Sequence, residues 1–363
     1  MSAPVDELKY ALEPAFYIDP DVFAHERKAV FARTWQYVGH VSQLQKPGDY
    51  FTAEIAGNSI IVLRDRNDEL RAFYNVCMHR AHELLQGSGN TRLIVCPYHA
   101  WNYELTGELR AGPNLKAVAG FDKRKICLTS LQLDNFLGFL FVNGDPNAAP
   151  MDECYPQARE QLAEFVPQIN ELQPVEYISV EEDCNWKISV ENYSECYHCK
   201  LNHPTFADGV VKAETYDIQP QGYCLRHTTE SQNLDKMSYP IDLNANKRAG
   251  EYSSWYLWPT FSFQVYPGNT LNTYHWEALE TERVRVTRGW YTVGGEASDV
   301  IHQLALQDRD TTLAEDIRLV ESVQRGLRSP GYKAGPLAID PNSGVMSEHS
   351  LHAFHNWVRE ALG

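Results

Sequence analysis

The chain contains two short segments that decide its fold, CMH at 77–79 and CPYH at 96–99. Each segment pairs a cysteine with a histidine, and each lies where an apolar, strand-like run (AFYNV or RLIVC) gives way to a loop. An isolated Cys or His is more often a satisfied core residue than a ligand. Four of them in this order indicate a metal centre held at the tips of two hairpin loops.

The sequence around these segments is typical of a compact all-β domain. Runs rich in β-branched and aromatic residues, such as SIIVLRD and GFLFVN, alternate with the turn signals PGD, GSGN, TGE and NGDP. We expect this all-β domain over residues 38–150, after a helical lead-in at 1–37. Residues 151–363 combine a helical pattern near 312–328 with strand-like stretches over 252–293, which predicts a second, mixed α/β domain. The predicted fold class is therefore α+β.

Composition and charge exclude several classes of protein. The 363 residues include 32 Lys and Arg against 48 Asp and Glu, a net charge of −16, so nucleic acid or an anionic membrane surface would be repelled. No stretch approaches the roughly 20 apolar residues that span a bilayer, and the start MSAPVDELKY lacks a signal pattern, so we expect a cytoplasmic protein. In that reducing compartment we expect Cys196 and Cys199 to be buried thiols rather than a disulfide.

A second cluster of ligand types lies in NWKISVENYSECYHCKLNHP, residues 185–204. On a helix, three of its polar residues would follow one ridge: Asn192, Glu195 and His198. His203 lies about 140° further round such a helix, so it could not share an ion with His198. Pro204 disfavours a helical conformation for His203. We therefore expect the helix to end just before His203, which then turns back to complete a two-histidine metal site.

The third ligand must come from elsewhere in the chain, since two histidines and one carboxylate form the facial triad of non-haem iron oxygenases. Asp316 is the candidate, because it interrupts an apolar stripe along a predicted helix: Leu313, Val320, Val323 and Leu327. A buried carboxylate needs a cation, a hydrogen-bond partner or a proton. The capping-box pattern from Thr312 to Glu315 predicts the start of this helix, where Asp316 could instead serve the helix dipole. Glu315 falls outside the stripe, and Asp310 is the alternative ligand.

These motifs resemble those of a known family. CMHRA at 77–81 and CPYHAW at 96–101 are similar to the CxHRG…CPYHGW cluster motif of Rieske non-haem iron oxygenases, with Ala81 and Ala100 where many members have Gly. Either alanine would be strained if its position needs a positive φ. The pattern N-x-x-E-x-x-H-x4-H resembles the family's iron motif, and EDIRLVESVQRGL its third-ligand helix. Glu195 stands where the bridging residue is more commonly Asp.

Three further stretches, ENYSECYHC, LVESVQRGLRSPGY and SEHSLHAFHNWV, are similar to the family's quaternary-ammonium subgroup, with carnitine monooxygenase oxygenase components nearest. The resemblance implies an N-terminal Rieske domain and a helix-grip type catalytic domain with an antiparallel sheet, on which the lead-in packs. It implies a [2Fe–2S] cluster on four ligands: Cys77, His79, Cys96 and His99. It also implies mononuclear Fe(II) on His198, His203 and Asp316.

The resemblance also implies the remaining parts of the reaction. Glu195 would be the bridge that carries electrons between the two metal sites of neighbouring subunits in a homotrimer, and Asn192 would orient groups beside the iron. The partners would be O₂, a small-molecule substrate and an NAD(P)H reductase with flavin and iron–sulfur groups. Hydroxylation beside the substrate nitrogen would lead to C–N cleavage. The substrate could be carnitine, γ-butyrobetaine, glycine betaine or another such compound, and plain hydroxylation stays open.

Eight aromatic residues within 255–276 favour a cationic substrate, although aromatics at strand spacing are more often core: Trp255, Tyr256, Trp258, Phe261, Phe263, Tyr266, Tyr274 and Trp276. We expect some of them to face the iron cavity. One alternative is an oxygenase acting on an aromatic ring or aromatic acid. Another is a non-catalytic zinc-binding interaction protein, which would be colourless where a Rieske protein is red-brown.

Overall fold

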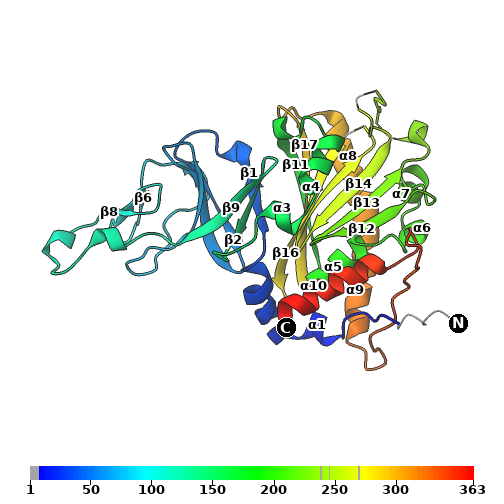
Figure 1. The fold of residues 1–363 in the computed structure, drawn as a ribbon, viewed down its shortest axis with the longest axis horizontal. Helices are drawn as coiled ribbons and strands as arrows, with labels where there is room; N and C mark the ends of the chain where they lie inside the picture. The colour runs from blue at the N-terminus through cyan, green and yellow to red at the C-terminus, as the bar shows by residue number, and fades with distance from the viewer. Residues whose placement is uncertain (1–7, 238, 245, 269) are drawn as a thin grey trace. The chain divides into compact units, whose positions relative to one another are not determined.

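A computed structural model describes residues 8–237, 239–244, 246–268 and 270–363 (Figure 1). The chain divides into two compact units. One is Arg27–Met151, called here the β unit. The other, called the mixed unit, joins Asp152–Gly363 to Met1–Glu26, of which the residues from Leu8 are described. In the described part of the chain, no helix is both long and apolar enough to cross a membrane.

The β unit is built from antiparallel strands. Its described residues form a seven-stranded sheet in the order β1-β10-β9-β4-β3-β2-β5 and a three-stranded sheet in the order β6-β7-β8. The strands are β1 Gln36–His40, β2 Asp49–Ile55, β3 Asn58–Arg64, β4 Leu70–Tyr74, β5 Ser88–Asn90, β6 Ile94–Val95, β7 Asn102–Tyr103, β8 Leu109–Ala111, β9 Ser130–Phe136 and β10 Phe139–Asn143. Short 3₁₀ turns are η2 Val41–Gln43, η3 Leu115–Ala117 and η4 Lys123–Lys125, and η1 Arg27–Phe31 is a π-helix.

Strand β3 separates two cores in this unit, because successive side chains of a strand point to opposite faces. Ile61 and Leu63 pack in the same cluster as Cys77 and Cys96. Ile60 and its alternate neighbours pack in the other cluster. The two cysteines predicted as ligands are therefore anchored in a hydrophobic core, while their loops continue outward from it.

The mixed unit is built on a second antiparallel sheet, so the predicted α+β fold is confirmed. Its described strands follow the order β11-β17-β16-β15-β14-β13-β12. They are β11 Leu172–Glu182, β12 Asp217–Gln221, β13 Cys224–Glu230, β14 Glu251–Leu257, β15 Phe261–Tyr266, β16 Thr270–Glu280 and β17 Arg283–Val293. Strands β11 and β17 pair antiparallel from Leu172 opposite Val293 to Glu182 opposite Val284.

Helices precede, separate and follow the strands of this sheet in the chain (Figure 1). They are α1 Ala15–Ile18, α2 Pro20–Glu26, α3 Met151–Cys154, α4 Ala158–Phe165, α5 Trp186–Tyr193, α6 Cys199–Asn202, α7 Pro204–Gly209, α8 Asp299–Asp308, α9 Ala314–Leu327 and α10 His349–Leu362, with 3₁₀ turns η5 Ile169–Glu171 and η6 Leu234–Lys236. Helix α5 contacts strands β16 and β17 as well as α9, and α9 contacts β11. The two helices that carry or flank the predicted iron ligands therefore pack against each other.

The expected capping box at Thr312 is wrong. The helical run begins at Asp299, where the Ser298 hydroxyl accepts a hydrogen bond from the amide of Ile301 at 3.2 Å. It continues through a π-helical segment, η7 Arg309–Leu313, into α9. Thr312 thus lies inside a helix and not at its start, because Ser298 already supplies the N-terminal cap. A π-helical turn holds one extra residue, so it changes the direction in which α9 presents its side chains.

A buried ion pair ties the N-terminal helices to α5. Lys187 Nζ lies 2.5 Å from Glu26 Oε1, and both side chains are at most 1% exposed. Trp186 Nε1 donates to the other oxygen of Glu26 at 2.9 Å. Burial lowers the pKa of Lys187, and the charge of Glu26 opposes that shift. Each charge is therefore satisfied only while the other is present.

We predict that Lys187→Met lowers the melting temperature by roughly 6–20 °C. Removing one partner of a buried pair costs about 3–5 kcal/mol, and 1 kcal/mol corresponds to about 2–4 °C in a domain of this size. Scanning calorimetry of the holoprotein measures the shift. The double variant Glu26→Leu with Lys187→Met should recover part of it, whereas Arg328→Met, which breaks an exposed pair with Glu282, should change little. Equal shifts for Lys187→Met and Arg328→Met would contradict the prediction.

Candidate metal centres and the cavity beside them

The two ligand-bearing loops of the β unit share one backbone geometry. In each loop an alanine amide donates to the cysteine carbonyl four residues earlier, from Ala81 to Cys77 at 2.9 Å and from Ala100 to Cys96 at 3.0 Å. Both alanines are left-handed, with φ of 58° and 55°. A side chain in this conformation costs about 1–2 kcal/mol. The strain expected at the two positions where many similar motifs have Gly is therefore present in both loops.

The cysteines of these loops are buried and the histidines are nearer the surface. Cys77 and Cys96 are 3% and 2% exposed, while His79 is exposed. The rings of His79 and His99 lie 4.9 Å apart, and His79 stacks on Trp101 with centroids 4.6 Å apart. Nδ1 of His99 is buried and has no hydrogen-bond partner among the described residues. Two adjacent imidazoles, one with an unmatched nitrogen, fit a pair of metal ligands.

The arrangement fits a two-iron cluster better than a zinc ion. Within the described residues, the group of three or more His, Cys, Asp or Glu side chains whose donor atoms all lie within 4.8 Å of one another is His198, His203 and Asp316. The four Cys and His of the β unit do not form such a group, whereas the donors of one tetrahedral zinc ion lie within about 4 Å of one another. In a Rieske centre the cysteines and histidines bind different irons, so their donors are spread apart.

The second centre lies in the mixed unit, where three donor atoms meet. His203 Nε2 lies 2.9 Å from Asp316 Oδ1 and 3.1 Å from His198 Nε2, and His198 Nε2 lies 3.7 Å from the same oxygen. Burial would raise the pKa of Asp316, but its interactions with His198 and His203 hold that pKa below its ordinary range. The structure thus brings together the three residues that the sequence predicted.

Two carboxylates hold the outer nitrogens of these histidines. Glu195 Oε1 lies 2.5 Å from His198 Nδ1, and Glu315 Oε2 lies 2.8 Å from His203 Nδ1. Each carboxylate accepts the Nδ1 proton, which leaves the Nε2 lone pair facing inward. Two lone pairs and the Asp316 carboxylate then converge on one point, which is unfavourable unless a cation occupies it. The residues present therefore fit a mononuclear metal ion.

The path of the chain through this site differs from the expected single helix. Helix α5 ends at Tyr193, so Asn192, Glu195 and His198 do not share a helical ridge. His203 lies between α6 and α7 with φ −120° and ψ 67°, outside the helical region. The prediction that Pro204 moves His203 out of the helix is confirmed. Asn192 remains near the site, with Nδ2 3.4 Å from His198 Nε2.

Two other expectations at this site need correction. Cys196 and Cys199 form a disulfide and are not free thiols, because the turn after α5 brings their Cα atoms to 4.9 Å. Asp310, the alternative ligand, is exposed and paired with Arg309. Glu315 was missed as a functional residue, since it lies off the apolar stripe of α9. Its contact with His203 joins segments that are far apart in the chain, and no local sequence signal predicts it.

Aromatic side chains surround the second centre. A cavity of about 50 Å³ adjoins the three donors, and its described lining includes Tyr193, Phe206, Tyr216, Tyr252, Tyr266 and Tyr274. The expectation that some aromatics of 255–276 face the cavity is confirmed for Tyr266 and Tyr274. The other six lie outside the described lining, and all six are buried. None of the lining residues described is Lys or Arg.

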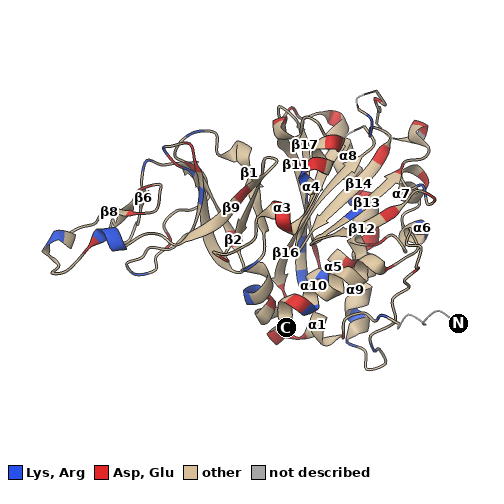
Figure 2. Cartoon of the chain, viewed as in Figure 1, with Lys and Arg blue, Asp and Glu red and all other residues tan. Residues whose placement is uncertain are grey.

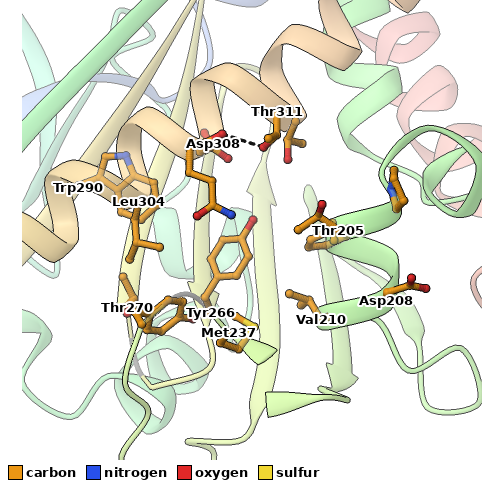
Figure 3. A pocket seen from close by; sticks show the side chains of 16 residues that line it. Thr205, Asp208, Val210, Met237, Tyr266, Thr270, Trp290, Leu304, Asp308 and Thr311 are labelled. Atoms are coloured by element: carbon orange, nitrogen blue, oxygen red, sulfur yellow. Dashed lines mark hydrogen bonds between the residues drawn. The ribbon is translucent and has the colours of Figure 1, made fainter. Parts of the chain in front are cut away.

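A larger cavity of about 390 Å³ adjoins this one and shares three of its lining residues, Phe206, Tyr266 and Thr312. Figure 3 shows Thr205 and Asp208 of α7 on one side of it and Leu304 and Asp308 of α8 on the other. No described residue in its lining is Lys or Arg either. The larger cavity is of the size that binds small molecules, and the shared residues connect it to the metal donors.

Comparisons with known proteins agree with this geometry. Residues 34–122 match the Rieske [2Fe–2S] domain, and residues 169–363 match the catalytic domain of the ring hydroxylating alpha subunit. The carnitine monooxygenase oxygenase subunit of Acinetobacter baumannii is 35% identical over 357 residues, covering 98% of this chain and 95% of that protein. The chloroplastic choline monooxygenase of Beta vulgaris is 27% identical, covering 97% of this chain and 77% of that protein.

A solved structure of the quaternary ammonium Rieske monooxygenase CntA in complex with L-carnitine has a TM-score of 0.85 and 33% identity, covering 98% of this chain and 96% of that one. The sequence identity and the fold agree over both units. The chain therefore belongs to the Rieske-type ring-hydroxylating oxygenases, iron-dependent oxidoreductases in which a Rieske [2Fe–2S] domain is joined to a catalytic domain that binds mononuclear iron.

Proposed function

We propose that this chain is the oxygenase component of a two-component monooxygenase that oxidises a carnitine-like quaternary ammonium substrate. The observation that carries the proposal is the cavity beside His198, His203 and Asp316, which is walled by aromatic rings and whose described lining has no Lys or Arg. Aromatic faces attract a cation that has no N–H to donate. The names of the two relatives and of the structural neighbour, which concern carnitine and choline, support the same substrate class.

The same observation weighs against the alternative of an aromatic-acid oxygenase. A benzoate-type carboxylate would be bound most strongly by a guanidinium or ammonium group. The described cationic side chain near the cavity is Arg288, which lies over Tyr274 at 3.8 Å and is already paired with Asp308. Acidic side chains also occur on the mixed unit, for example on α3 and α8 (Figure 2). With a net charge of −16, the protein favours the approach of a cation.

We assign the metal ligands as follows. Cys77 and Cys96 hold one iron of the [2Fe–2S] cluster, and His79 and His99 hold the other. His198, His203 and Asp316 hold mononuclear Fe(II). When bound, the cluster supplies single electrons and the mononuclear iron supplies open positions for O₂ and its activation. The chain's own part is to fix the histidines through Glu195 and Glu315 and to present the substrate carbon.

Glu195 is proposed as the bridge for electrons between neighbouring subunits of a trimer. Its carboxylate reaches His198 on the inside, and the residues beside it face outward, with Tyr197 and Leu201 45% and 86% exposed. The β unit likewise exposes Met78 and Tyr98 beside its histidines, at 45% and 50%. Apolar side chains exposed next to both centres support a subunit contact at each of them.

The overall reaction consumes O₂, two electrons and two protons, and it leaves one oxygen atom on the substrate and one in water. Electrons come from NAD(P)H through a reductase with flavin and iron–sulfur groups. Hydroxylation of a carbon bound to nitrogen gives a hemiaminal-like product, whose C–N bond then breaks. We propose this outcome over plain hydroxylation, and we propose a cytoplasmic location on the grounds of composition.

Asp316→Ala should lower turnover and mononuclear iron content by at least about 100-fold, since even residues outside the ligand set cost 10–100-fold. The visible spectrum of the cluster should stay unchanged, because the cluster ligands lie in the other unit. Iron analysis and an O₂-dependent product assay measure the two effects. Asp310→Ala is the matched control and should behave as wild type. Retained activity and iron content in the Asp316 variant would contradict the assignment of Asp316 as a ligand.

Glu195→Gln keeps the shape of the side chain and removes its charge. We expect both metals to load and electron transfer from the cluster to the mononuclear iron to fail. Single-turnover reoxidation of the reduced cluster, followed by absorbance, tests this. Glu315→Gln is the matched control, because it makes the same change beside the other histidine; its amide oxygen can still accept the Nδ1 proton, so we expect it to load iron and to retain electron transfer. Iron loss in Glu195→Gln would show that Glu195 supports the metal and not the transfer.

Carnitine should bind more tightly than its carbon isostere, in which a neutral carbon replaces the charged nitrogen and the carboxylate is kept. Each ring contributes about 0.5–2 kcal/mol to binding a cation, so the expected preference is at least about fivefold if two rings participate. Titration calorimetry of the anaerobic, reduced protein measures both affinities. Equal affinity would remove the argument from the aromatic walls. Turnover of benzoate-type acids without any response to betaines would establish the alternative function.

A further inference from the structure

One wall of the small cavity carries a histidine that the metal assignment does not use. His227, on β13, lines the cavity and is 2% exposed. Its Nδ1 lies 2.8 Å from the hydroxyl of Tyr216, which also lines the cavity. Its Nε2 is buried and has no hydrogen-bond partner among the described residues. A buried polar atom left without a hydrogen bond costs about 1–3 kcal/mol of stability, so a ligand that forms a hydrogen bond with this nitrogen would remove that cost.

The hydrogen bond with Tyr216 fixes the chemical character of that nitrogen. Tyr216 is buried, and the described structure offers its hydroxyl proton no acceptor other than His227 Nδ1. Burial lowers the pKa of His227 to about 3, and nearby His349 adds to the effect, so the ring is neutral at physiological pH. A neutral imidazole that accepts at Nδ1 carries its proton on Nε2. His227, a residue of the cavity lining, therefore carries one uncharged and unmatched N–H donor.

Three other polar side chains of the wall are engaged with protein partners. Tyr193 bonds with Ser262 at 2.6 Å, and Tyr252 accepts from Gln264 at 2.6 Å. Glu195 is committed to His198. The ring faces can contact a quaternary nitrogen, and an oxygen atom on the same molecule needs a hydrogen-bond donor. His227 is a lining residue whose buried Nε2 has no hydrogen-bond partner among the described residues.

We propose that His227 Nε2 donates a hydrogen bond to an oxygen on the carbon chain of the substrate, and so selects quaternary ammonium compounds that carry a hydroxyl or carboxylate. This specificity role rests on the proposed function. Tyr216 is a positioning residue, since it acts only by holding the tautomer of His227. The acceptor is either a hydroxyl or a carboxylate oxygen, because a neutral donor suits both.

Two ligand pairs distinguish these acceptors. Carnitine and γ-butyrobetaine differ by one hydroxyl group, whereas γ-butyrobetaine and butyltrimethylammonium differ by the carboxylate. Titration calorimetry of the anaerobic, reduced holoenzyme gives an affinity ratio for each pair. In wild type we expect at least one ratio to favour the oxygen-bearing member by about three- to tenfold, the contribution of one hydrogen bond. The pair that shows it identifies the oxygen.

His227→Leu should bring that ratio to about one while changing the affinity for butyltrimethylammonium by less than about twofold. His227→Gln, which keeps an N–H group at this position, should retain most of the wild-type ratio. Tyr216→Phe, which leaves His227 in place but removes its hydrogen-bond partner, should retain only part of it. His275→Leu, on β16 outside the cavity lining, is the control and should keep the wild-type ratio. Cluster spectrum, iron content and melting temperature verify that each variant is folded and loaded.

Four outcomes overturn the inference. An unchanged ratio in His227→Leu would mean that ordered water satisfies Nε2. Equal weakening of all three ligands in His227→Leu and His227→Gln would mean a structural role. Wild type that binds all three ligands equally would refute the selectivity alone, and the proposed function would stand. Wild type that binds none of them would refute both. If His227→Leu does not fold, the Gln and Tyr216→Phe variants decide the question by the same ratios.

Discussion

The architecture of the mixed unit depends on one electrostatic constraint, the convergence of three electron-rich donors on one point. The Nε2 atoms of His198 and His203 lie 3.1 Å apart, and Asp316 Oδ1 lies 2.9 Å from the second. These atoms repel one another unless a cation lies among them. Glu195 and Glu315 prevent the rings from turning away, because each holds an Nδ1 proton. The site is thus built in a state that a metal ion stabilises.

Irregular backbone is what makes this convergence possible. A continuous helix would have placed His198 and His203 on different faces, but α5 ends early and His203 lies at a break between two short helices. The π-helical segment η7 directly precedes α9, whose first turn carries Glu315 and Asp316 beside the histidines. The β unit uses a comparable device, since both ligand loops close through an alanine with positive φ. In each unit, local strain positions the donors.

The parts of this protein that the sequence predicted are those set by short-range patterns. The spacing of Cys77, His79, Cys96 and His99, and the effect of Pro204 on His203, are encoded within a few residues. Asp316 was found because a carboxylate in an apolar stripe has no other simple explanation. The start of the helix at Asp299 and the role of Glu315 were missed. The start at Asp299 is set by the local cap of Ser298, whereas the role of Glu315 depends on its contact with His203, a residue far away in the chain.

The same limit explains the cavity. Tyr193, Tyr216, Tyr252 and His227 come from α5, the segment before β12, β14 and β13, in that order, and only the assembled sheet brings them around the metal donors. In the assembled cavity, the carboxylates and the aromatic rings have different roles. The carboxylates at the site are committed to histidines, so a cationic ligand meets rings and not free anions. Ring contacts are individually weak, which allows a permanently charged molecule to be held beside the metal and still be released. Selectivity must then come from neutral hydrogen bonding.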